Sequence, residues 1–328
     1  MKRVLTGIKP TGLPHIGNYF GAIKPALSLS DQYDSFYFIA DYHALTTIKD
    51  PKLMSDYSLN IAAAWLALGL DPEKTVFYKQ SDIPEIFELA WILSCFAAKG
   101  LLNRAHAYKS AVDENLKLHH DMDHNINHGI FAYPVLMAAD ILLFNTDLVP
   151  VGADQKQHIE IARDIAESVN KVAGNVLTVP EPLIHDDTKL VPGIDGLKMS
   201  KNYNNTLPIF LTEKKLRKKV MQIVTDSTPV EDSKNSENCN VFKLFSLFNT
   251  TQEQEDLSKR YKKGGLGYGT VKQELYESIL DYFSDSRSKY DTIIENPIHC
   301  RELLEEGRVK ARKIATSTIV KVKESLGF

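Results

Sequence analysis

The sequence predicts an α/β fold, a parallel sheet with helices on both faces, followed by a mostly α-helical domain. Up to about residue 180, brief runs rich in Val, Ile, Phe and Tyr alternate with longer helical patterns, the order typical of parallel sheets. After residue 195, helical patterns continue with little sign of strands. We therefore expect two domains, residues 1–194 and residues 195–328.

Four short runs are expected to form the sheet. They are KRVLTG (2–7), SFYFIAD (35–41), TVFYKQ (75–80) and DLVPVG (147–152). Ligands of parallel sheets bind where the strands end and the helices begin. The segments 7–18, 41–43 and 152–155 lie at such ends, so residues far apart in the sequence are expected to share one cleft.

The runs between the strands carry helix signals. Residues 50–70 open with Asp-Pro and close near Gly69, and residues 81–100 end at a glycine in the same way. Apolar residues recur at helical spacing in 154–174. In the second domain, helices are expected at 212–220, 242–249, 252–263, 270–295 and 297–323. GGLGYG at 264–269 follows no strand, which favours a helix–helix loop over a dinucleotide-binding fingerprint.

Composition excludes several classes of protein. Of the 328 residues, 43% are hydrophobic and 25% charged, as in globular proteins with a substantial core. No apolar run is long enough to span a membrane, and the N-terminus lacks the apolar stretch of a signal peptide. The three cysteines, Cys95, Cys239 and Cys300, form no C-x-x-C pair. They favour reduced thiols in a cytoplasmic protein over disulfides or a structural metal.

Charge is distributed unevenly along the chain. Residues 1–197 have 16 Lys and Arg against 24 Asp and Glu, whereas residues 198–328 have 23 against 18. The net charge of −3 argues against a protein that coats nucleic acid generally. The basic clusters at 213–220 and 308–313 suit a polyanion, although solvated helix faces show the same pattern.

The glycine-rich segment GLPHIGNYFG at 12–21 lies where a strand gives way to a helix. Its glycine spacing resembles that of a P-loop, but Leu13-Pro14 stands where Lys-Ser or Lys-Thr is required, so a P-loop is rejected. Backbone N–H groups at a helix start suit a phosphate, and His15 can donate a hydrogen bond to a phosphate oxygen. An ordinary turn with a surface histidine is the alternative.

A second loop, GLKMSKNYNN at 196–205, has two lysines flanking Met199-Ser200. Lysines on a mobile loop can fold over a triphosphate and stabilise its charge during transfer. The tetrapeptide alone is weak evidence, but its pairing with HIGN at 15–18 is strong.

HIGN (15–18) and KMSKN (198–202) together resemble the two signatures of class I aminoacyl-tRNA synthetases. The resemblance narrows to the tryptophanyl-tRNA synthetases of bacterial type, through blocks that agree in order and spacing. These blocks are GIKPTG (7–12), IADYHA (39–44), YPVLMAADILL (133–143) and VPVGADQKQHIEIARDIA (149–166). Asn18 replaces a second histidine of the general signature, Lys9 replaces a common glutamine, and Asn202 replaces the last serine of the lysine loop.

The resemblance implies a Rossmann-like catalytic domain and a helical anticodon-binding domain. It also implies activation of L-tryptophan by ATP, with Mg²⁺ carried by the ATP and no metal site on the protein, then transfer to tRNA(Trp) by a cytoplasmic homodimer. The implied catalytic residues are His15, Lys109, Lys198 and Lys201. The implied ATP contacts are Lys9, Pro10, Thr11, Gly17, Asn18, Gly152, Ala153, Asp154, Val191, Lys198, Met199, Ser200, Lys201 and Asn202. The implied tryptophan pocket is Ala40, His43, Tyr133, Met137, Asp140 and Gln155.

Asp140 is the residue on which we expect substrate choice to depend. The surrounding MAADILL is otherwise apolar, so its carboxylate needs a reason to be there. A partly buried Asp that accepts the indole N–H rejects Phe, because the carboxylate is otherwise left desolvated and unpaired. The alternatives are an aspartate on a helix surface or at a cap, with Tyr133 and Met137 as ordinary core and His43 as a structural histidine.

Three histidines, His120, His124 and His128, lie four apart in HHDMDHNINH. On a helix they would share a face and could bind a transition metal. The many polar residues favour a flexible loop beside the active site or a subunit contact. Two other functions remain as alternatives for the whole chain, a tyrosine-specific relative and a non-catalytic RNA-binding paralogue.

Overall fold

The sheet is five-stranded, parallel throughout, and ordered β3-β2-β1-β4-β5. A computed structural model describes residues 1–152, 156–184 and 191–328. The four expected strands are present as β1 (Arg3–Ile8), β2 (Asp34–Ile39), β3 (Thr75–Lys79) and β4 (Leu148–Val151). The fifth, β5 (Glu181–Ile184), was not predicted, because its four residues include only one β-branched or aromatic residue.

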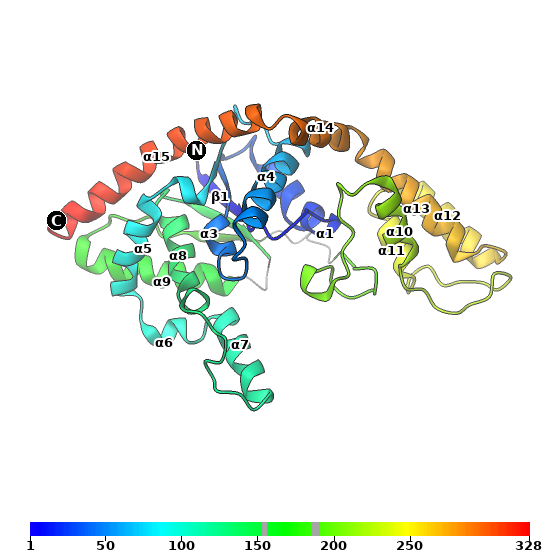
Figure 1. Cartoon of the computed structure of the whole chain (residues 1–328), viewed down its shortest axis with the longest axis horizontal. Helices are drawn as coiled ribbons and strands as arrows, with labels where there is room; N and C mark the ends of the chain where they lie inside the picture. Colours follow the sequence, from blue (N-terminus) through cyan, green and yellow to red (C-terminus); the bar gives the residue numbers. More distant parts are fainter. Residues whose placement is uncertain (153–155, 185–190) are drawn as a thin grey trace.

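Helices cover both faces of the sheet (Figure 1). In the α/β part the helical elements follow the strands in chain order. They are α1 (Ile16–Asn18), the π-helical η1 (Tyr19–Ile23), α2 (Lys24–Leu29), α3 (Asp41–Ala44), α4 (Pro51–Ala67), η2 (Gln80–Asp82), α5 (Glu85–Phe96), α6 (Lys99–Leu102), α7 (His106–Lys117), α8 (His128–Leu142) and α9 (Lys156–Ala173).

The helix signals at 50–70 are confirmed in detail. Asp50 caps α4 by accepting hydrogen bonds from the backbone N–H groups of Lys52 and Leu53. The chain leaves the helix at Gly69 with φ of +110°, a conformation that favours glycine. The helix expected at 81–100 is confirmed as α5 but is shorter, because Pro84 separates η2 from α5 and an extended turn at Ala97 and Ala98 separates α5 from α6.

The region after 195 is helical, as predicted. It contains η4 (Lys201–Tyr203), α10 (Glu213–Met221), α11 (Asn240–Phe245), α12 (Thr251–Lys263), α13 (Tyr268–Tyr282), α14 (Ser284–Glu295) and α15 (Ile298–Ser325). GGLGYG joins α12 to α13, which confirms the helix–helix loop. The one helix expected over 270–295 is two, because the chain turns at the buried Phe283.

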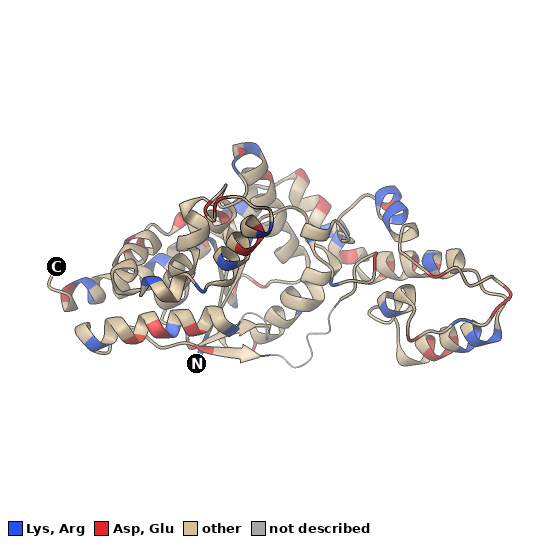
Figure 2. Ribbon diagram, turned by 90° about the horizontal axis from the view of Figure 1, so that it is seen from below, with Lys and Arg blue, Asp and Glu red and all other residues tan. Residues whose placement is uncertain are grey.

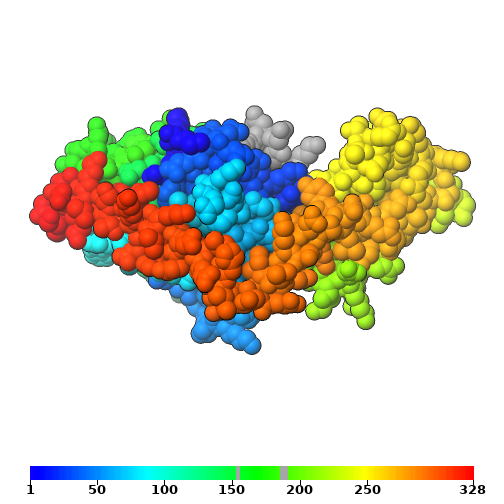
Figure 3. All heavy atoms as spheres, turned by 90° about the horizontal axis from the view of Figure 1, so that it is seen from above, coloured from blue at the N-terminus to red at the C-terminus, as the bar shows by residue number. Residues whose placement is uncertain are grey.

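The last helix, α15, returns to the sheet and lies along its edge strand. At Gly307 it approaches β3 so closely that a Cβ atom would lie 1.7 Å from the carbonyl oxygen of Phe77. Ala311, Ala315 and Ile319 continue into the same apolar core as α5 and α8. Figure 3 shows α15 as a continuous orange-to-red band along this surface. In the described ranges, none of the helices has both the length and the apolar character needed to cross a membrane.

Alternate residues of the strands supply two cores, one on each face of the sheet. Phe36 and Phe38 of β2 point to one face, and Tyr37 and Ile39 to the other. A third core joins helices α10 to α13, and it includes Ile16 and Met199. The helical region is therefore packed against both the HIGN segment and the lysine loop.

Candidate functional site

A cavity of about 550 Å³ opens where the central strands end. The ends of β1, β2 and β4 form its floor, and α3, α7, α8 and α9 form its walls. At the floor the ring of Phe38 lies over Gly7, where a Cβ atom would come within 2.4 Å of the ring. Of the residues implied for the site, six line this cavity: Lys9, Ala40, His43, Tyr133, Met137 and Asp140.

Asp140 is the buried carboxylate of this cavity. It is 1% exposed on α8, so neither the surface nor the cap alternative holds. Its Oδ2 pairs with Nε2 of His43 at 2.8 Å, and both carboxylate oxygens accept from Nε2 of Gln80 at 2.8 and 2.9 Å. Burial raises the pKa of Asp140, while the hydrogen bond and charge of His43 act in the opposite direction. Because a carboxylate has about four acceptor positions, room for one further donor remains.

Gln80 was missed by sequence reasoning. It lies directly after β3, it is fully buried, and its Oε1 accepts a hydrogen bond from the backbone N–H of His43 at 3.3 Å. One amide thus joins α3, β3 and α8 around Asp140. A glutamine after a strand has no distinctive sequence pattern, so only the fold reveals this position.

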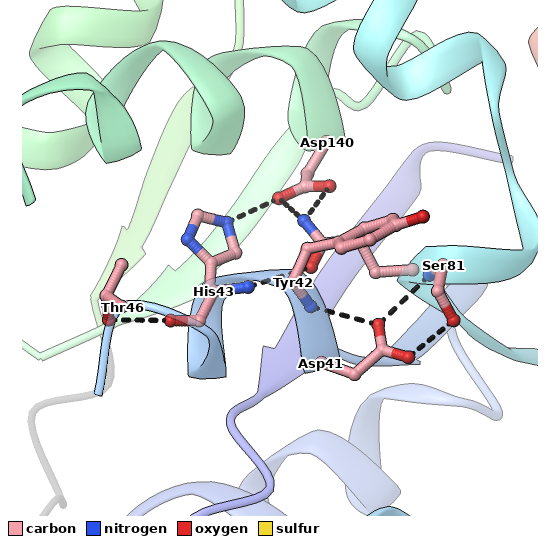
Figure 4. A network of polar contacts seen from close by, with 7 residues as sticks. Asp41, Tyr42, His43, Thr46, Ser81 and Asp140 are labelled. Atoms are coloured by element: carbon pink, nitrogen blue, oxygen red, sulfur yellow. Dashed lines mark hydrogen bonds and ion pairs between the residues drawn. The ribbon is translucent and has the colours of Figure 1, made fainter. Parts of the chain in front are cut away.

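A second carboxylate fastens the same two turns together. Asp41 accepts hydrogen bonds from the backbone N–H of Ser81 at 3.0 Å and from that of Tyr42 at 3.1 Å. The Ser81 hydroxyl also donates to Asp41. Figure 4 shows Asp41 and Ser81 on one side of α3 and Asp140 with His43 on the other. His43 is therefore fixed at two points, by its backbone N–H on Gln80 and by its ring Nε2 on Asp140.

Tyr133 and Met137 lie one turn apart on α8, facing the cavity. The Tyr133 hydroxyl forms a hydrogen bond with Nε2 of His158 at 2.9 Å, and burial raises the pKa of this phenol. His158, on α9, also lines the cavity and was not predicted as a site residue. The rest of the lining is mostly apolar, and a mostly apolar cavity with a few polar groups suits an aromatic ligand with an N–H edge.

His15 is an N-cap and is 5% exposed, so the alternative of a surface histidine is wrong. Its Nδ1 accepts a hydrogen bond from the backbone N–H of Asn18 at 3.2 Å, and the Asn18 side chain accepts from the His15 N–H at 3.1 Å. Burial, assisted by the charge of Lys201, lowers the pKa of His15 to about 4. At neutral pH the ring is therefore neutral, with its proton on Nε2, and can donate from that atom.

The lysine loop lies against the HIGN segment. Nζ of Lys201 lies 3.3 Å from Oγ1 of Thr11 and donates to the carbonyl oxygen of Gly12 at 3.1 Å. Burial lowers the pKa of Lys201 to about 8. Met199 is buried, and its sulfur accepts the N–H of Gly17 at 3.3 Å. The two signatures, 182 residues apart in sequence, are thus in direct contact.

Several other implied residues lie in or beside these loops. Val191 is buried and its carbonyl accepts the Met199 N–H at 2.9 Å, while Lys198 forms a backbone bridge with Pro192. The Ser200 hydroxyl accepts the N–H of Asn202 at 3.3 Å. Pro10 is buried beyond β1, and Gly152 follows β4. Ala153, Asp154 and Gln155 lie outside the described residues.

Lys109 stands apart from the cavity. It is exposed on α7, although Ala107 and Ala111 of the same helix line the wall. Figure 1 shows α6 and α7 projecting from the body of the α/β part. The phosphate role implied for Lys109 stays a prediction.

The histidine-rich segment does not form one helix face. His120 and His124 lie in the turn between α7 and α8, with ring centroids 4.5 Å apart, and His128 begins α8. The amide of Asn115 closes this turn by donating to the carbonyls of Met122 and His124. Within the described part of the chain, no three His, Cys, Asp or Glu residues are placed to hold a metal ion.

Comparison with known proteins supports a specific family. The family model of the class I tRNA synthetases (W and Y) matches residues 1–284 of this chain. The tryptophan–tRNA ligase of Campylobacter jejuni is 50% identical over 326 residues, covering 99% of this chain and 100% of the relative. That of Fusobacterium nucleatum is 48% identical over 329 residues, covering 100% and 98%.

A solved structure supports the same family. The C. jejuni tryptophanyl-tRNA synthetase, in complex with ADP and tryptophan, has a TM-score of 0.92 at 50% identity, covering 99% of this chain and all of that one. The chain therefore belongs to the class I tRNA synthetases of the tryptophan and tyrosine family.

Proposed function

We propose that the chain is a tryptophan–tRNA ligase that activates L-tryptophan with ATP and transfers it to tRNA(Trp). The observation that carries the choice of amino acid is the buried carboxylate of Asp140 in a mostly apolar cavity, with one acceptor position left. An indole N–H fills that position, whereas phenylalanine leaves the desolvated carboxylate without its partner. The relatives that match over the full length are tryptophan–tRNA ligases.

In the first step, the tryptophan carboxylate attacks the α-phosphate of ATP and pyrophosphate leaves. The enzyme supplies no nucleophile, so its residues position the reactants and stabilise charge. His15 donates from Nε2 to a phosphate oxygen, and it does so as a neutral group because its pKa is about 4. Lys198 and Lys201 follow the negative charge that moves onto the leaving pyrophosphate.

The positions of the loops support the remaining ATP contacts that we propose. The segment 9–11, the helix start at 17–18 and the lysine loop all meet beside the cavity. Backbone N–H groups at such a helix start suit phosphate oxygens. Gly152, Val191 and the segment 153–154 complete the proposed ATP site, and Gln155 completes the tryptophan pocket.

Mg²⁺ is proposed to arrive with ATP. No group of three His, Cys, Asp or Glu residues is placed to hold a metal across residues 1–152, 156–184 and 191–328. Phosphate oxygens and water are ligands that Mg²⁺ accepts readily. When bound to the phosphates, the ion supplies further neutralisation of their charge.

In the second step, a ribose hydroxyl of tRNA attacks the carbonyl of the tryptophanyl adenylate and AMP leaves. The helical region from residue 195 is proposed to bind the anticodon part of the tRNA. In α10, Lys214, Lys215, Arg217 and Lys218 are exposed, and Figure 2 shows blue turns on the helices of this region. Such cations bind phosphates without regard to sequence.

We further propose that the enzyme works in the cytoplasm as a homodimer. In support of the dimer, α5 presents an exposed aromatic face that includes Phe87 and Trp91, the latter 73% exposed. Exposed apolar patches of this kind mark protein interfaces. Cys95, Cys239 and Cys300 are free thiols, which suits a reducing compartment.

Pyrophosphate exchange with single amino acids tests the proposal. Tryptophan is expected to support exchange of labelled pyrophosphate into ATP, and tyrosine and phenylalanine are not. Exchange with tyrosine alone would assign the chain to the tyrosine-specific relative. No exchange with any amino acid, together with tRNA binding, would assign it to the non-catalytic class.

A further inference from the structure

A buried amide, Asn205, is the last residue of the lysine loop, and none of the roles above assigns it a function. It is 1% exposed, and its side chain uses both N–H donors and its oxygen. Nδ2 donates to Oδ1 of Asp195 at 2.8 Å and to the carbonyl of Lys198 at 3.0 Å. Oδ1 accepts the backbone N–H of Ser200 at 2.8 Å. Three points of one loop are therefore tied to one side chain.

Two of these contacts lie on either side of Met199, between the two lysines of the loop. The carbonyl of Lys198 and the N–H of Ser200 lie on either side of Met199, so Asn205 fixes both peptide planes around it. With these planes fixed, the Met199 side chain is turned inward, onto the N–H of Gly17. The same arrangement carries Lys201 to Thr11 and Gly12.

The site is shaped for an asparagine. A Cβ atom on Gly193 would lie 2.3 Å from Cγ of Asn205, so only glycine leaves room for the amide. Aspartate has the same shape but cannot donate to Asp195 or to the Lys198 carbonyl, and it would place two carboxylates together. Alanine would leave the buried carbonyl of Lys198 and the N–H of Ser200 without these partners.

We propose that Asn205 is a positioning residue for the transfer of charge to pyrophosphate: it holds the lysine loop in the conformation that presents Lys198 and Lys201 to ATP. The inference rests on the proposed function, since it explains how Lys198 and Lys201 are positioned for adenylate formation. It acts through the lysines and touches no substrate. Its loss is therefore felt in the rate of adenylate formation and not in the binding of tryptophan.

The test compares Asn205→Asp and Asn205→Ala with wild type and with Asn249→Ala. Asn249 is a matched control, because its amide donates to the carbonyl of Phe245 in the helical core, away from the loop. Rates of pyrophosphate exchange are normalised to tryptophan sites counted by equilibrium dialysis. Both Asn205 variants are expected to lose about 10-fold or more in kcat, with the Kd of tryptophan within about twofold of wild type.

Limited trypsin digestion of the full chain gives a readout that does not depend on activity. Cleavage after Lys198 and Lys201, identified by fragment mass, is expected to accelerate in both Asn205 variants and not in the control. Unchanged cleavage, or faster cleavage with unchanged exchange, would overturn the inference. An equal loss of tryptophan binding would mark general damage and would also overturn it. Should wild type show no exchange with tryptophan, the proposed function fails, while the digestion still decides whether Asn205 holds the loop. If Asn205→Ala does not fold, the isosteric Asn205→Asp carries the test.

Discussion

Replacement of Asp140 by alanine is expected to weaken tryptophan binding far more than ATP binding. In the free protein the carboxylate holds His43 at 2.8 Å and Gln80 at 2.8 and 2.9 Å, and the tryptophan-bound state adds the indole N–H. The variant leaves the first two donors unpaired in both states, so this cost appears in stability. The affinity for tryptophan therefore changes only by the indole contact, which the variant cannot form.

The magnitude follows from that contact. A hydrogen bond to a buried charged group contributes about 1.5 to 3 kcal/mol. Because each 1.4 kcal/mol is tenfold in affinity, the KM for tryptophan is expected to rise about 10- to 150-fold. The KM for ATP is expected to stay within about twofold, since the proposed phosphate contacts are on the other loops. Asp140→Asn keeps the shape and one acceptor oxygen, so it is expected to fall between wild type and Asp140→Ala.

The assay is pyrophosphate exchange with tryptophan and ATP varied in turn. Asp147→Ala is the matched control, because Asp147 accepts the backbone N–H of Arg3 at 2.7 Å at the opposite end of the sheet. It is expected to lower the melting temperature without changing either KM. Equal increases in both KM values for Asp140→Ala, or an unchanged KM for tryptophan, would refute the placement of the indole beside Asp140.

Four further predictions concern the loops, the assembly and the last helix. Lys198→Ala is expected to slow adenylate formation in single-turnover experiments while the Kd of tryptophan stays nearly intact, because its side chain is proposed to act on the phosphates. Burial holds the pKa of Lys201 at about 8, so its charge is lost as the pH rises through that value; kcat/KM for ATP is expected to fall there, and Lys201→Arg is expected to remove the fall. Because α5 is the face proposed for the dimer, Trp91→Glu is expected to convert the proposed dimer into chains of 36.9 kDa in light scattering. Gly307→Ala is expected to destabilise the protein by about 1 to 3 kcal/mol in urea unfolding, because the new methyl group meets a backbone oxygen.

Each of these has a contrary result. An unchanged single-turnover rate would remove Lys198 from the phosphate site, and an alkaline fall that persists in Lys201→Arg would assign it to another group. An unchanged mass of Trp91→Glu would remove α5 from the proposed dimer interface. Val172→Glu, at an exposed apolar residue of α9, is the control for assembly and is expected to leave the mass unchanged. Gly100→Ala is the control for Gly307, because no atom lies within 4 Å of its new Cβ. Equal stability of the two glycine variants would contradict the close approach of α15 to β3.

Sequence patterns predicted the elements whose signals are local. The four strands rich in β-branched and aromatic residues, the Asp-Pro start of α4 and the glycine loop between α12 and α13 all depend on neighbouring residues. β5 was missed because its four residues, Glu-Pro-Leu-Ile, include only one β-branched or aromatic residue. The return of α15 to the sheet was also invisible, since a glycine inside a helix indicates only a weaker helix until its neighbour is known.

The site was predictable where a residue type is unusual for its surroundings. A carboxylate inside MAADILL stood out, and so did a histidine among glycines. Gln80 and His158 did not, because an amide after a strand and a histidine on an amphipathic helix are ordinary residues until the fold places them beside Asp140 and Tyr133. The capping role of His15 was hidden for a related reason: histidine is not among the usual N-cap residues.

Charging of purified tRNA(Trp) tests the central claim most directly. With ATP and labelled amino acid, the full chain is expected to esterify tRNA(Trp) with tryptophan and to leave it uncharged with tyrosine. Charging with tyrosine in place of tryptophan, or no charging of a tRNA that the protein binds, would contradict the account.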